Sequence, residues 1–206
     1  YAQPMAVIDI AKDISEGLAR MACVAEIDGE VKDLRTIVDK DCTLNIFTAK
    51  DPEGLAALRH TASHVMAQAI KHLYPQAKFW VGPVVAEGFY YDIDLGEDVI
   101  RDEDIEKITK EMKKVVKSGK KIIRREVSKK EALEMFADDP YKLDLIADLE
   151  EGNITVYDQG DFTDLCRGPH VDNVKLCKHF KLIRHSGAYW KGDSKNKMLQ
   201  RIYGVC

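Results

Sequence analysis

The sequence predicts an α+β protein in which a small amino-terminal module precedes a larger domain organised around one long helix. Three observations lead to this prediction. Residues 1–50 combine a helical segment with a hairpin turn and a final strand. Residues 51–74 have the apolar periodicity of a long helix. From residue 75 onward short strands and helices alternate without internal repeats, so we expect helices mixed with antiparallel sheet.

Length and composition are those of a globular protein. The chain has 206 residues, of which 45% are hydrophobic and 32% charged. No apolar run approaches the length of a membrane span. The five cysteines form no CxxC pair, which favours a reducing, cytoplasmic location over a disulfide framework. Because the chain begins at Tyr1 and not at Met, we expect a trimmed chain.

The charge is unevenly placed along the chain. A net charge of -4 argues against a wholly basic nucleic-acid-binding domain. Residues 107–130 nevertheless hold 11 Lys and Arg, and residues 175–201 hold eight more. We interpret the first run as a solvated helix face. In the second run Tyr189 and Trp190 lie among the bases, so a phosphate-bearing partner and simple solubility explain it equally well.

The amino-terminal module contains three recognisable elements. Residues 4–14 predict a short helix, with Pro4 near its start and apolar side chains on one face. Residues 21–27 and 30–34 flank Asp28-Gly29, a strong hairpin signal. Residues 42–48 predict a further strand. These elements lack enough apolar surface for a core unless another strand precedes Tyr1.

The long helix carries the most suggestive pair of residues. Asp51 can cap it, and Pro52 suits its first position. His60 and His64 are four residues apart, so one turn separates them on the same face. This face lies opposite the apolar stripe, and we therefore expect both rings to face solvent or a cleft. His72 lies at the edge of the stripe and is expected to pack or cap.

Shorter elements follow the long helix. Alternation over residues 88–95 predicts a strand, and residues 102–118 predict an amphipathic helix closed by Gly119. Ser128 and Glu131 form a capping box for a short helix. The remaining predicted elements are strands at residues 78–81, 122–127, 154–157, 180–184 and 198–203, and a helix at residues 140–151.

A second group of polar residues lies at residues 164–170, where Cys166 and His170 repeat the spacing of the histidine pair. Together with His60 and His64 they could bind zinc. Neutral imidazoles could equally take a proton from water without a metal, and a Cys–His nucleophile is a third possibility. Spacing alone leaves these three open. The sequence has neither HExxH nor a glycine-rich phosphate loop, so metalloprotease and ATP chemistry are not expected.

Four motifs together resemble the amino-terminal half of bacterial-type threonyl-tRNA synthetases. They are His60-Thr-Ala-Ser-His64, Gly88-Phe-Tyr-Tyr-Asp92, Cys166-Arg-Gly-Pro-His170 and the stretch from Ala188 to Gly204. The last is long and the most specific. The resemblance implies that residues 1–50 form a TGS module of the β-grasp fold, apparently without its first strand. It also implies that residues 51–206 form an editing domain, whose HxxxH and CxxxH pattern is shared with alanyl-tRNA editing proteins.

The function implied by this resemblance is hydrolytic editing of mischarged Ser-tRNA(Thr). The expected partners are the acceptor end of tRNA(Thr) and the rest of a synthetase, which would form a homodimer through its catalytic core; no membrane partner is expected. The chain ends before any class II catalytic core, so we expect it to charge no tRNA. The alternatives are a zinc-dependent deacylase of the alanyl type and a non-catalytic tRNA-binding or regulatory module.

The resemblance also assigns roles to individual residues. His60 would orient or polarise the attacking water, directly or through the terminal ribose hydroxyl. Lys142 would neutralise developing charge, and Asp164 would hold the α-ammonium or hydroxyl group of the substrate. Zinc is possible at the HxxxH and CxxxH positions, but we expect a site without a metal. The implied catalytic residues are His60, His64, Lys142, Cys166 and His170, and the implied substrate-binding residues are Tyr91 and Asp164.

Overall fold

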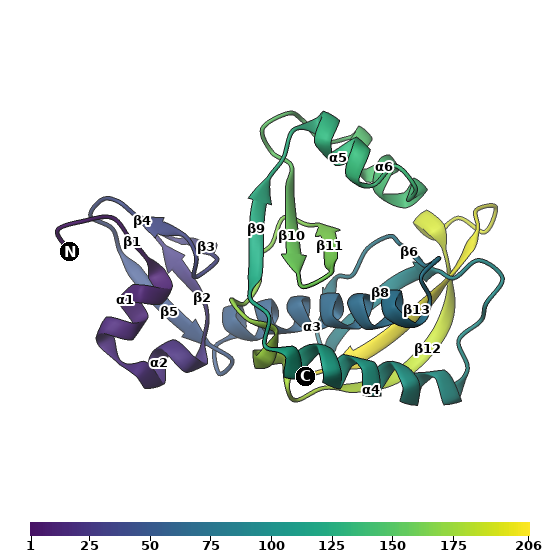
Figure 1. Ribbon diagram of the computed structural model, residues 1–206, viewed down its shortest axis with the longest axis horizontal. Helices are drawn as coiled ribbons and strands as arrows, with labels where there is room; N and C mark the ends of the chain where they lie inside the picture. The colour runs from purple at the N-terminus through teal and green to yellow at the C-terminus, as the bar shows by residue number, and fades with distance from the viewer.

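A computed structural model describes all 206 residues and divides them into a small amino-terminal part and a larger part around one central helix (Figure 1). Helices and strands are mixed, and every strand pairing is antiparallel. The predicted α+β class is therefore confirmed. No helix is both long enough and apolar enough to cross a membrane.

The amino-terminal part packs two short helices against a three-stranded sheet. The strand order in this sheet is β3-β2-β5, and β1 pairs with β4 in a separate two-residue ladder. A small core of four buried residues, among them Val7 and Leu34, lies between the helices and the sheet. The elements are β1 (Met5–Ala6), α1 (Val7–Ile14), α2 (Glu16–Met21), β2 (Ala22–Ile27), β3 (Glu30–Lys32), β4 (Ile37–Val38) and β5 (Leu44–Thr48).

The helices in this part differ from the sequence prediction in two ways. The first helix begins at Val7, because Met5 and Ala6 are extended and pair with β4. A second helix, α2, was not predicted; the side chain of Ser15 caps it by accepting the Leu18 N–H. The hairpin turn is confirmed: Asp28 and Gly29 have φ of 50° and 87°, the left-handed conformation that a tight two-residue turn requires.

Helix α3 (Pro52–Leu73) runs through the middle of the larger part (Figure 1). All ten residues from 61 to 70 are buried. We predicted that His60 and His64 face solvent or a cleft. The solvent alternative is wrong for His64, which is 3% exposed, because α4, β8 and β2 pack around the helix. Asp51 occupies the cap position, but its carboxylate accepts the Thr48 N–H at 2.8 Å and no helical N–H.

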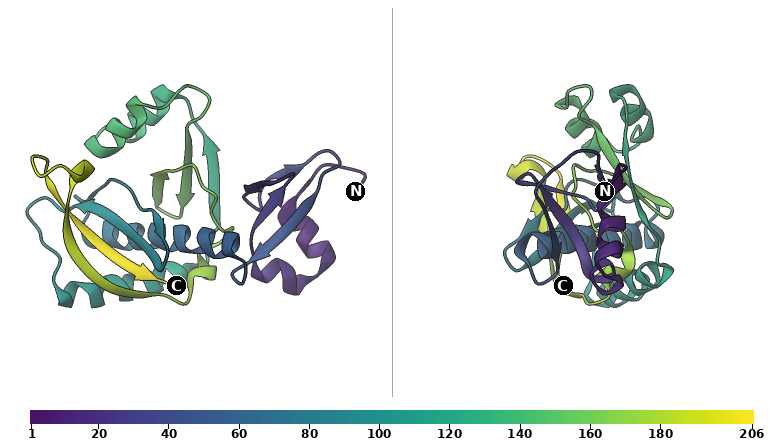
Figure 2. Two further views of the ribbon diagram at one scale, coloured as in Figure 1. Left: turned by 180° about the vertical axis from the view of Figure 1, so that it is seen from behind. Right: turned by 90° about the vertical axis from the view of Figure 1, so that its left-hand side faces the viewer.

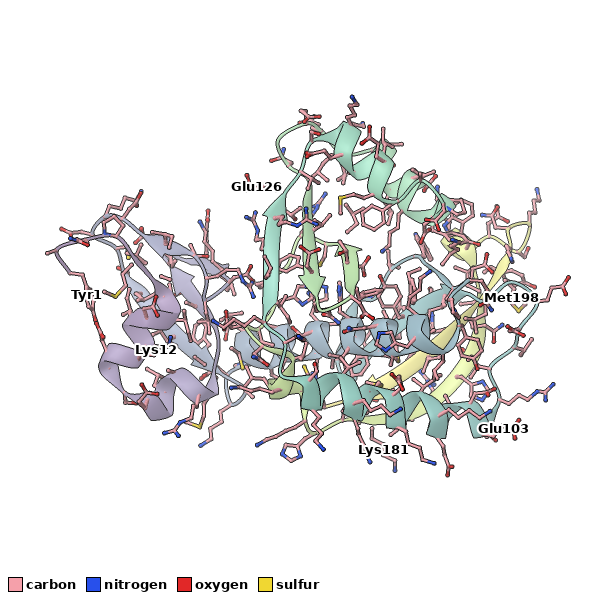
Figure 3. All side chains as sticks on the ribbon, viewed as in Figure 1. Tyr1, Lys12, Glu103, Glu126, Lys181 and Met198 are labelled. Carbon is pink, nitrogen blue, oxygen red and sulfur yellow. The ribbon has the colours of Figure 1, made fainter.

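The largest sheet lies on one side of α3 and has the order β12-β13-β8-β6, with β7 also paired to β8. Phe89, Tyr91 and Ile93 alternate along β8 and are at most 1% exposed, which confirms the predicted alternation. Side chains fill the space between the sheet, α3 and α4 (Figure 3). The elements are β6 (Lys78–Phe79), β7 (Val84–Val85), β8 (Gly88–Asp94), α4 (Asp102–Ser118), β12 (Lys181–Tyr189) and β13 (Met198–Val205).

A third group of elements forms a lobe that projects from α3 (Figures 1 and 2). Its sheet has the order β11-β10-β9, and α5 and α6 lie at its far end. The capping box of Ser128 and Glu131 is confirmed. Strand β11 was not predicted, because it is only four residues long. The elements are β9 (Ile122–Glu126), α5 (Lys129–Met135), α6 (Pro140–Ala147), β10 (Thr155–Gln159) and β11 (Phe162–Leu165), followed by the 3-10 turns η1 (Val174–Cys177) and η2 (Trp190–Gly192).

The basic run at residues 107–130 is largely a solvated surface, as predicted. The five lysines of α4 are exposed, and two of them form ion pairs with acids three residues away on the same helix, Asp104 and Glu111. His72 neither packs nor caps. It is exposed, and its two ring nitrogens contact Glu111 at 3.0 Å and Asp161 at 2.9 Å. These contacts tie α3 to α4 and to the turn between β10 and β11.

We expect His72 to stabilise the fold more at acidic than at alkaline pH. Burial, the largest single effect, lowers its pKa, but hydrogen bonds to Asp161 and Glu111 outweigh it and raise the pKa above 6.5. A raised folded-state pKa gives a contribution that is complete below pH 6.5 and is lost as pH rises through the folded value. The site is exposed, so the contribution is only about 0.5 kcal/mol.

Urea unfolding of wild type and His72→Gln at pH 5.5 and pH 9 measures this contribution. We expect the difference between the two proteins to be larger at pH 5.5. An equal difference at both pH values would show that the ion pairs contribute nothing.

Candidate active site

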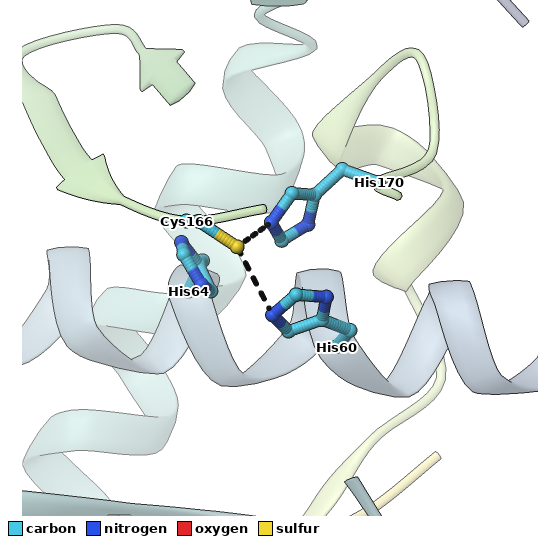
Figure 4. Close-up of side chains that lie close together, drawn as sticks. All are labelled: His60, His64, Cys166 and His170. Carbon is cyan, nitrogen blue, oxygen red and sulfur yellow. Dashed lines mark hydrogen bonds between the residues drawn. The ribbon is translucent and has the colours of Figure 1, made fainter. Parts of the chain in front are cut away.

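Three histidines and one cysteine converge at one point of the larger part. His60 and His64 project from α3, Cys166 directly follows β11, and His170 lies in the loop beyond it (Figure 4). Cys166 Sγ is 3.3 Å from His60 Nε2 and 3.2 Å from His170 Nε2. One potential ligand atom from each of the four residues lies within 4.8 Å of the others. The two sequence motifs therefore form a single site.

The rings of this cluster pack closely on one another. His60 stacks on His170 with ring centroids 4.1 Å apart, and His64 meets His170 edge-on at 4.4 Å. His64 and His170 are buried, whereas His60 and Cys166 are partly exposed. A cleft of about 290 Å³ meets the cluster at Cys166; it is lined by Val81, Leu145, Leu149, Asn153, Thr155, Leu165, Cys166 and Arg167.

Hydrogen bonds assign the same tautomer to His60 and His170. The Pro169 carbonyl can only accept, so His60 Nδ1, 3.3 Å away, carries a proton. Thr61 donates its hydroxyl proton to Ala57 O at 2.8 Å, and its oxygen therefore accepts from His170 Nδ1 at 3.0 Å. In both rings Nε2 is left as a lone pair directed at the cysteine sulfur.

Burial keeps all four groups uncharged at neutral pH. It lowers the pKa of His60, lowers that of His64 to about 3 and lowers that of His170 far below 6.5. Burial also raises the pKa of the Cys166 thiol to about 12. The site thus holds neutral imidazoles beside a protonated thiol. This state is ready to accept a proton and does not supply the thiolate that a Cys–His nucleophile requires.

A buried ion pair adjoins the cluster. Lys142 Nζ lies 2.7 Å from Asp164 Oδ1, and both side chains are at most 3% exposed. Lys142 also donates to Trp80 O at 2.9 Å and to the Tyr91 hydroxyl at 3.0 Å. Its three N–H groups are therefore all paired. Tyr91 in turn donates to Asp164 Oδ2.

The ion pair and the histidine cluster form one contiguous group. His64 Nδ1 lies 3.5 Å from Asp164 Oδ2. Burial, the largest single effect, would raise the pKa of Asp164, but the charge of Lys142 and the hydrogen bonds from Lys142 and Tyr91 outweigh it and lower the pKa. Asp164 is thus an anion beside the neutral imidazoles. All seven residues named from the sequence lie in this group, although its geometry does not by itself assign their roles.

Several residues that hold the group in place were not predicted from the sequence. Asp139 caps α6 by accepting the N–H groups of Tyr141 and Lys142, and it also accepts the Phe79 N–H, which fixes the position of Lys142. The Asp-Pro pair before a helical segment is a capping signal that could have revealed it. Thr61, inside the first motif, holds His170. Gly82 leaves room for Tyr91, since a Cβ there would lie 2.5 Å from the ring.

The donor set fits a tetrahedral metal ion such as zinc. Bond lengths of about 2.0–2.3 Å separate the ligand atoms of such an ion by roughly 3.3–3.8 Å. The two sulfur–nitrogen distances are 3.2 and 3.3 Å. The Nδ1 atoms of His60 and His170 also have the outer partners typical of metal-binding histidines. Binding would require Cys166 to lose its proton.

Comparisons with known proteins agree with this architecture. Residues 3–48 match the TGS domain, and residues 154–203 match the family described as threonyl and alanyl tRNA synthetase second additional domain. The chain is therefore a TGS domain followed by a domain of the kind associated with tRNA synthetase editing.

Individual relatives specify the family further. Over 98% of its length, the chain is 50% identical to threonine–tRNA ligase of Desulfatibacillum aliphaticivorans. Over its whole length it is 52% identical to the Clostridioides difficile enzyme and 49% identical to that of Acetivibrio thermocellus. It spans 31% to 33% of the length of these relatives. The chain belongs to the threonyl-tRNA synthetase family and corresponds to its amino-terminal region.

We expect the two partners of the buried ion pair to be strongly coupled. Lys142→Met leaves the Asp164 carboxylate buried without its cation and should destabilise the fold by about 3–5 kcal/mol. Asp164→Asn added to this variant removes the unpaired charge. The double variant should therefore lose less stability than the sum of the two single variants, by about 1–3 kcal/mol.

Urea unfolding of the wild type, both single variants and the double variant gives the coupling energy. Additive losses would mean that the two charges do not stabilise each other. Lys130→Met on the neighbouring helix α5 is the lysine control, because Lys130 is exposed and lies outside the pair.

Proposed function

We propose that this chain hydrolyses the ester of tRNA(Thr) mischarged with serine. One observation carries the proposal: the partly exposed His60 is a neutral imidazole whose Nε2 lone pair faces Cys166, and Cys166 lines a cleft. The same cluster contacts the buried Asp164 carboxylate through His64. This combination provides a proton acceptor for water and a group that can bind an amino acid. The relatives named threonine–tRNA ligase supply the substrate class.

The choice of serine follows from a physical limit on recognition. Serine lacks one methyl group of threonine, and a group of that size is worth only ~1–3 kcal/mol in a binding pocket. A synthetic site that accepts threonine therefore cannot reject serine well enough. A second site that is too small for threonine and hydrolyses the serine ester supplies the missing selectivity.

His60 has the properties of a general base for this reaction. Its Nδ1–H is held by Pro169 O, and its unprotonated Nε2, 3.3 Å from the Cys166 sulfur, carries the lone pair that takes a proton. Water attacks the ester carbon while Nε2 takes one of its protons, directly or through the terminal ribose hydroxyl. The bond from carbon to the ribose oxygen then breaks, and the proton passes to that oxygen. Cys166 and His170 lie beside Nε2 and shape its surroundings.

Asp164, Lys142 and Tyr91 serve the amino acid side of the substrate in this proposal. The Asp164 anion attracts the α-ammonium group, and His64 and Tyr91 hold the carboxylate in place. All three N–H groups of Lys142 are already paired, so Lys142 is a positioning residue that offsets negative charge without direct contact.

The expected RNA partner finds a basic groove next to the site. A groove of about 800 Å³ is lined by Lys32, Arg35, Arg124 and Arg167, and also by Pro169 of the site loop. Such a surface attracts the phosphates of a tRNA acceptor end. The basic run near the carboxyl end is a weaker candidate, because both of its arginines already stack on aromatic rings of the chain: Arg184 on Tyr203 and Arg201 on Tyr90.

The site belongs to a larger assembly in this proposal. We place the boundary between the TGS module and the editing domain at residue 50, and assign only the editing step to this chain. The remainder of a threonyl-tRNA synthetase is its other partner, joined as a homodimer through segments outside residues 1–206. All five cysteines are free, which supports a cytoplasmic location.

Deacylation assays test the proposed reaction. The chain should hydrolyse Ser-tRNA(Thr) and leave Thr-tRNA(Thr) intact. His60→Ala removes the general base and should lower the rate about 100-fold or more. His72→Gln is the matched control, because His72 lies on the same helix but outside the site, and its rate should equal that of wild type.

Two results would contradict the proposal: equal hydrolysis of both esters, or full activity in His60→Ala. Binding of tRNA(Thr) without any turnover would instead favour a non-catalytic tRNA-binding module.

A zinc-dependent deacylase is the second candidate, and the two Nε2 lone pairs facing a thiol favour it. His60, His64, Cys166 and His170 would hold the ion, which would supply Lewis acidity toward the ester or water. We propose the metal-free reaction because the neutral imidazole of His60 already provides a proton acceptor without an ion. Protein purified in the presence of zinc should therefore contain well under one zinc per chain and keep its activity in a chelator. Stoichiometric zinc that is lost in Cys166→Ser would establish the second candidate.

A further inference from the structure

Two residues of the TGS module reach the loop that carries Cys166 and His170. Asp33 and Arg35 lie in the turn between β3 and β4, beside β9 of the larger part (Figure 1). Asp33 is 5% exposed, although it belongs to a surface turn. Its carboxylate is therefore enclosed by groups of the other domain.

The contacts bind two successive residues of the loop. Asp33 Oδ1 accepts the His170 backbone N–H at 2.7 Å. Arg35 Nη2 donates to the Val171 carbonyl at 3.2 Å, and Arg35 Nη1 forms an ion pair with Asp33 Oδ2 at 2.7 Å. The TGS module thus supplies partners for one backbone N–H and one backbone carbonyl of the loop. The charges of Asp33 and Arg35 also pair with each other at this place.

A third contact supports the imidazole itself. The Tyr157 hydroxyl donates to Asp33 Oδ2 at 2.7 Å, and its ring meets His170 edge-on at a centroid distance of 4.5 Å. The loop closes tightly over this hydroxyl, since a Cβ at Gly168 would lie 2.1 Å from it. Gly168 also has φ of +76°, which a glycine adopts without strain. Asp33 therefore fixes both the backbone and the ring side of His170.

The loop held in this way also orients His60. Pro169, directly before the clamped His170 amide, supplies the carbonyl that holds His60 Nδ1. The position of that carbonyl decides which nitrogen of His60 carries the proton. One carboxylate in the TGS module thereby controls the geometry of two imidazoles in the other domain.

We propose that Asp33 is a positioning residue of the editing site, so that ester hydrolysis depends on the TGS module through this carboxylate; the catalytic consequence rests on the proposed function. Asp33 acts as an acceptor for the His170 N–H and the Tyr157 hydroxyl. Asp33→Asn keeps an oxygen for the His170 N–H, whereas Asp33→Ala keeps none. Asp39→Ala is the control, because Asp39 is an exposed acid of the same module.

The first measurement does not require activity. In nitrogen-15-labelled protein, Asp33→Ala should speed hydrogen exchange of the His170 amide at least about tenfold. Asp33→Asn should have a smaller effect, and Asp39→Ala should have none. Unchanged exchange in Asp33→Ala would overturn the proposal. If Asp33→Ala does not fold, Asp33→Asn and Tyr157→Phe replace it in the test. The proposal is overturned if hydrogen exchange at the His170 amide is unchanged in both of these variants.

The second measurement follows hydrolysis of Ser-tRNA(Thr). Asp33→Ala should lower kcat about tenfold with KM nearly unchanged, and Asp33→Asn should recover most of the loss. Wild-type kcat in Asp33→Ala, or a loss confined to KM, would overturn the proposal. If the wild-type chain hydrolyses neither ester while exchange at His170 still responds to Asp33→Ala, the proposed function fails and the clamp on the loop stands.

Discussion

The buried ion pair between Lys142 and Asp164 is the interaction on which the site depends. It joins α6 to β11, and through Tyr91 it joins both to β8 of the largest sheet. Removing two charges from water is unfavourable, and such a pair stabilises a fold only when its remaining donors and acceptors are also satisfied. Here the three N–H groups of Lys142 have acceptors, and Asp139 fixes the helix turn from which Lys142 projects. The pair therefore sets where the lobe of β9, β10 and β11 lies against the main sheet.

The histidine cluster depends on this pair for its electrostatic environment. The three imidazoles and the thiol of the cluster are uncharged. The anion that His64 contacts is Asp164. The carboxylate is held ionised by Lys142, and a proton that arrives in the cluster finds negative charge close by. Burial opposes that proton, and it is the larger of the two effects on His64. The balance favours a base that is neutral at rest and takes a proton only transiently, which suits attack by water on an ester.

Sequence patterns identified local features well and tertiary ones poorly. The strand β8, helix α4 and the Ser128 capping box follow from short-range periodicity and were predicted correctly. The helix wheel of α3 placed both histidines on one face but could not predict what covers that face, because it ranks faces by hydrophobicity and contains no information about elements that pack from several sides. Residue spacing alone left zinc binding, metal-free proton transfer and a Cys–His nucleophile open. The resemblance to a known family was needed to name all seven residues of the site. Asp33 gave no signal, since 137 residues separate it from His170.

Backbone hydrogen bonding explains why the site includes part of another module. The loop from Cys166 to Val171 has no regular structure, and buried peptide groups in such a loop need partners from elsewhere. The His170 N–H and the Val171 carbonyl find theirs in Asp33 and Arg35. Each group left unpaired in the interior would cost about 1–3 kcal/mol. A loop built only from the larger domain would therefore be less stable, or would move toward water and carry His170 away from Cys166. The TGS module and the site loop are consequently parts of one packed unit, even though their sequences belong to separate domains.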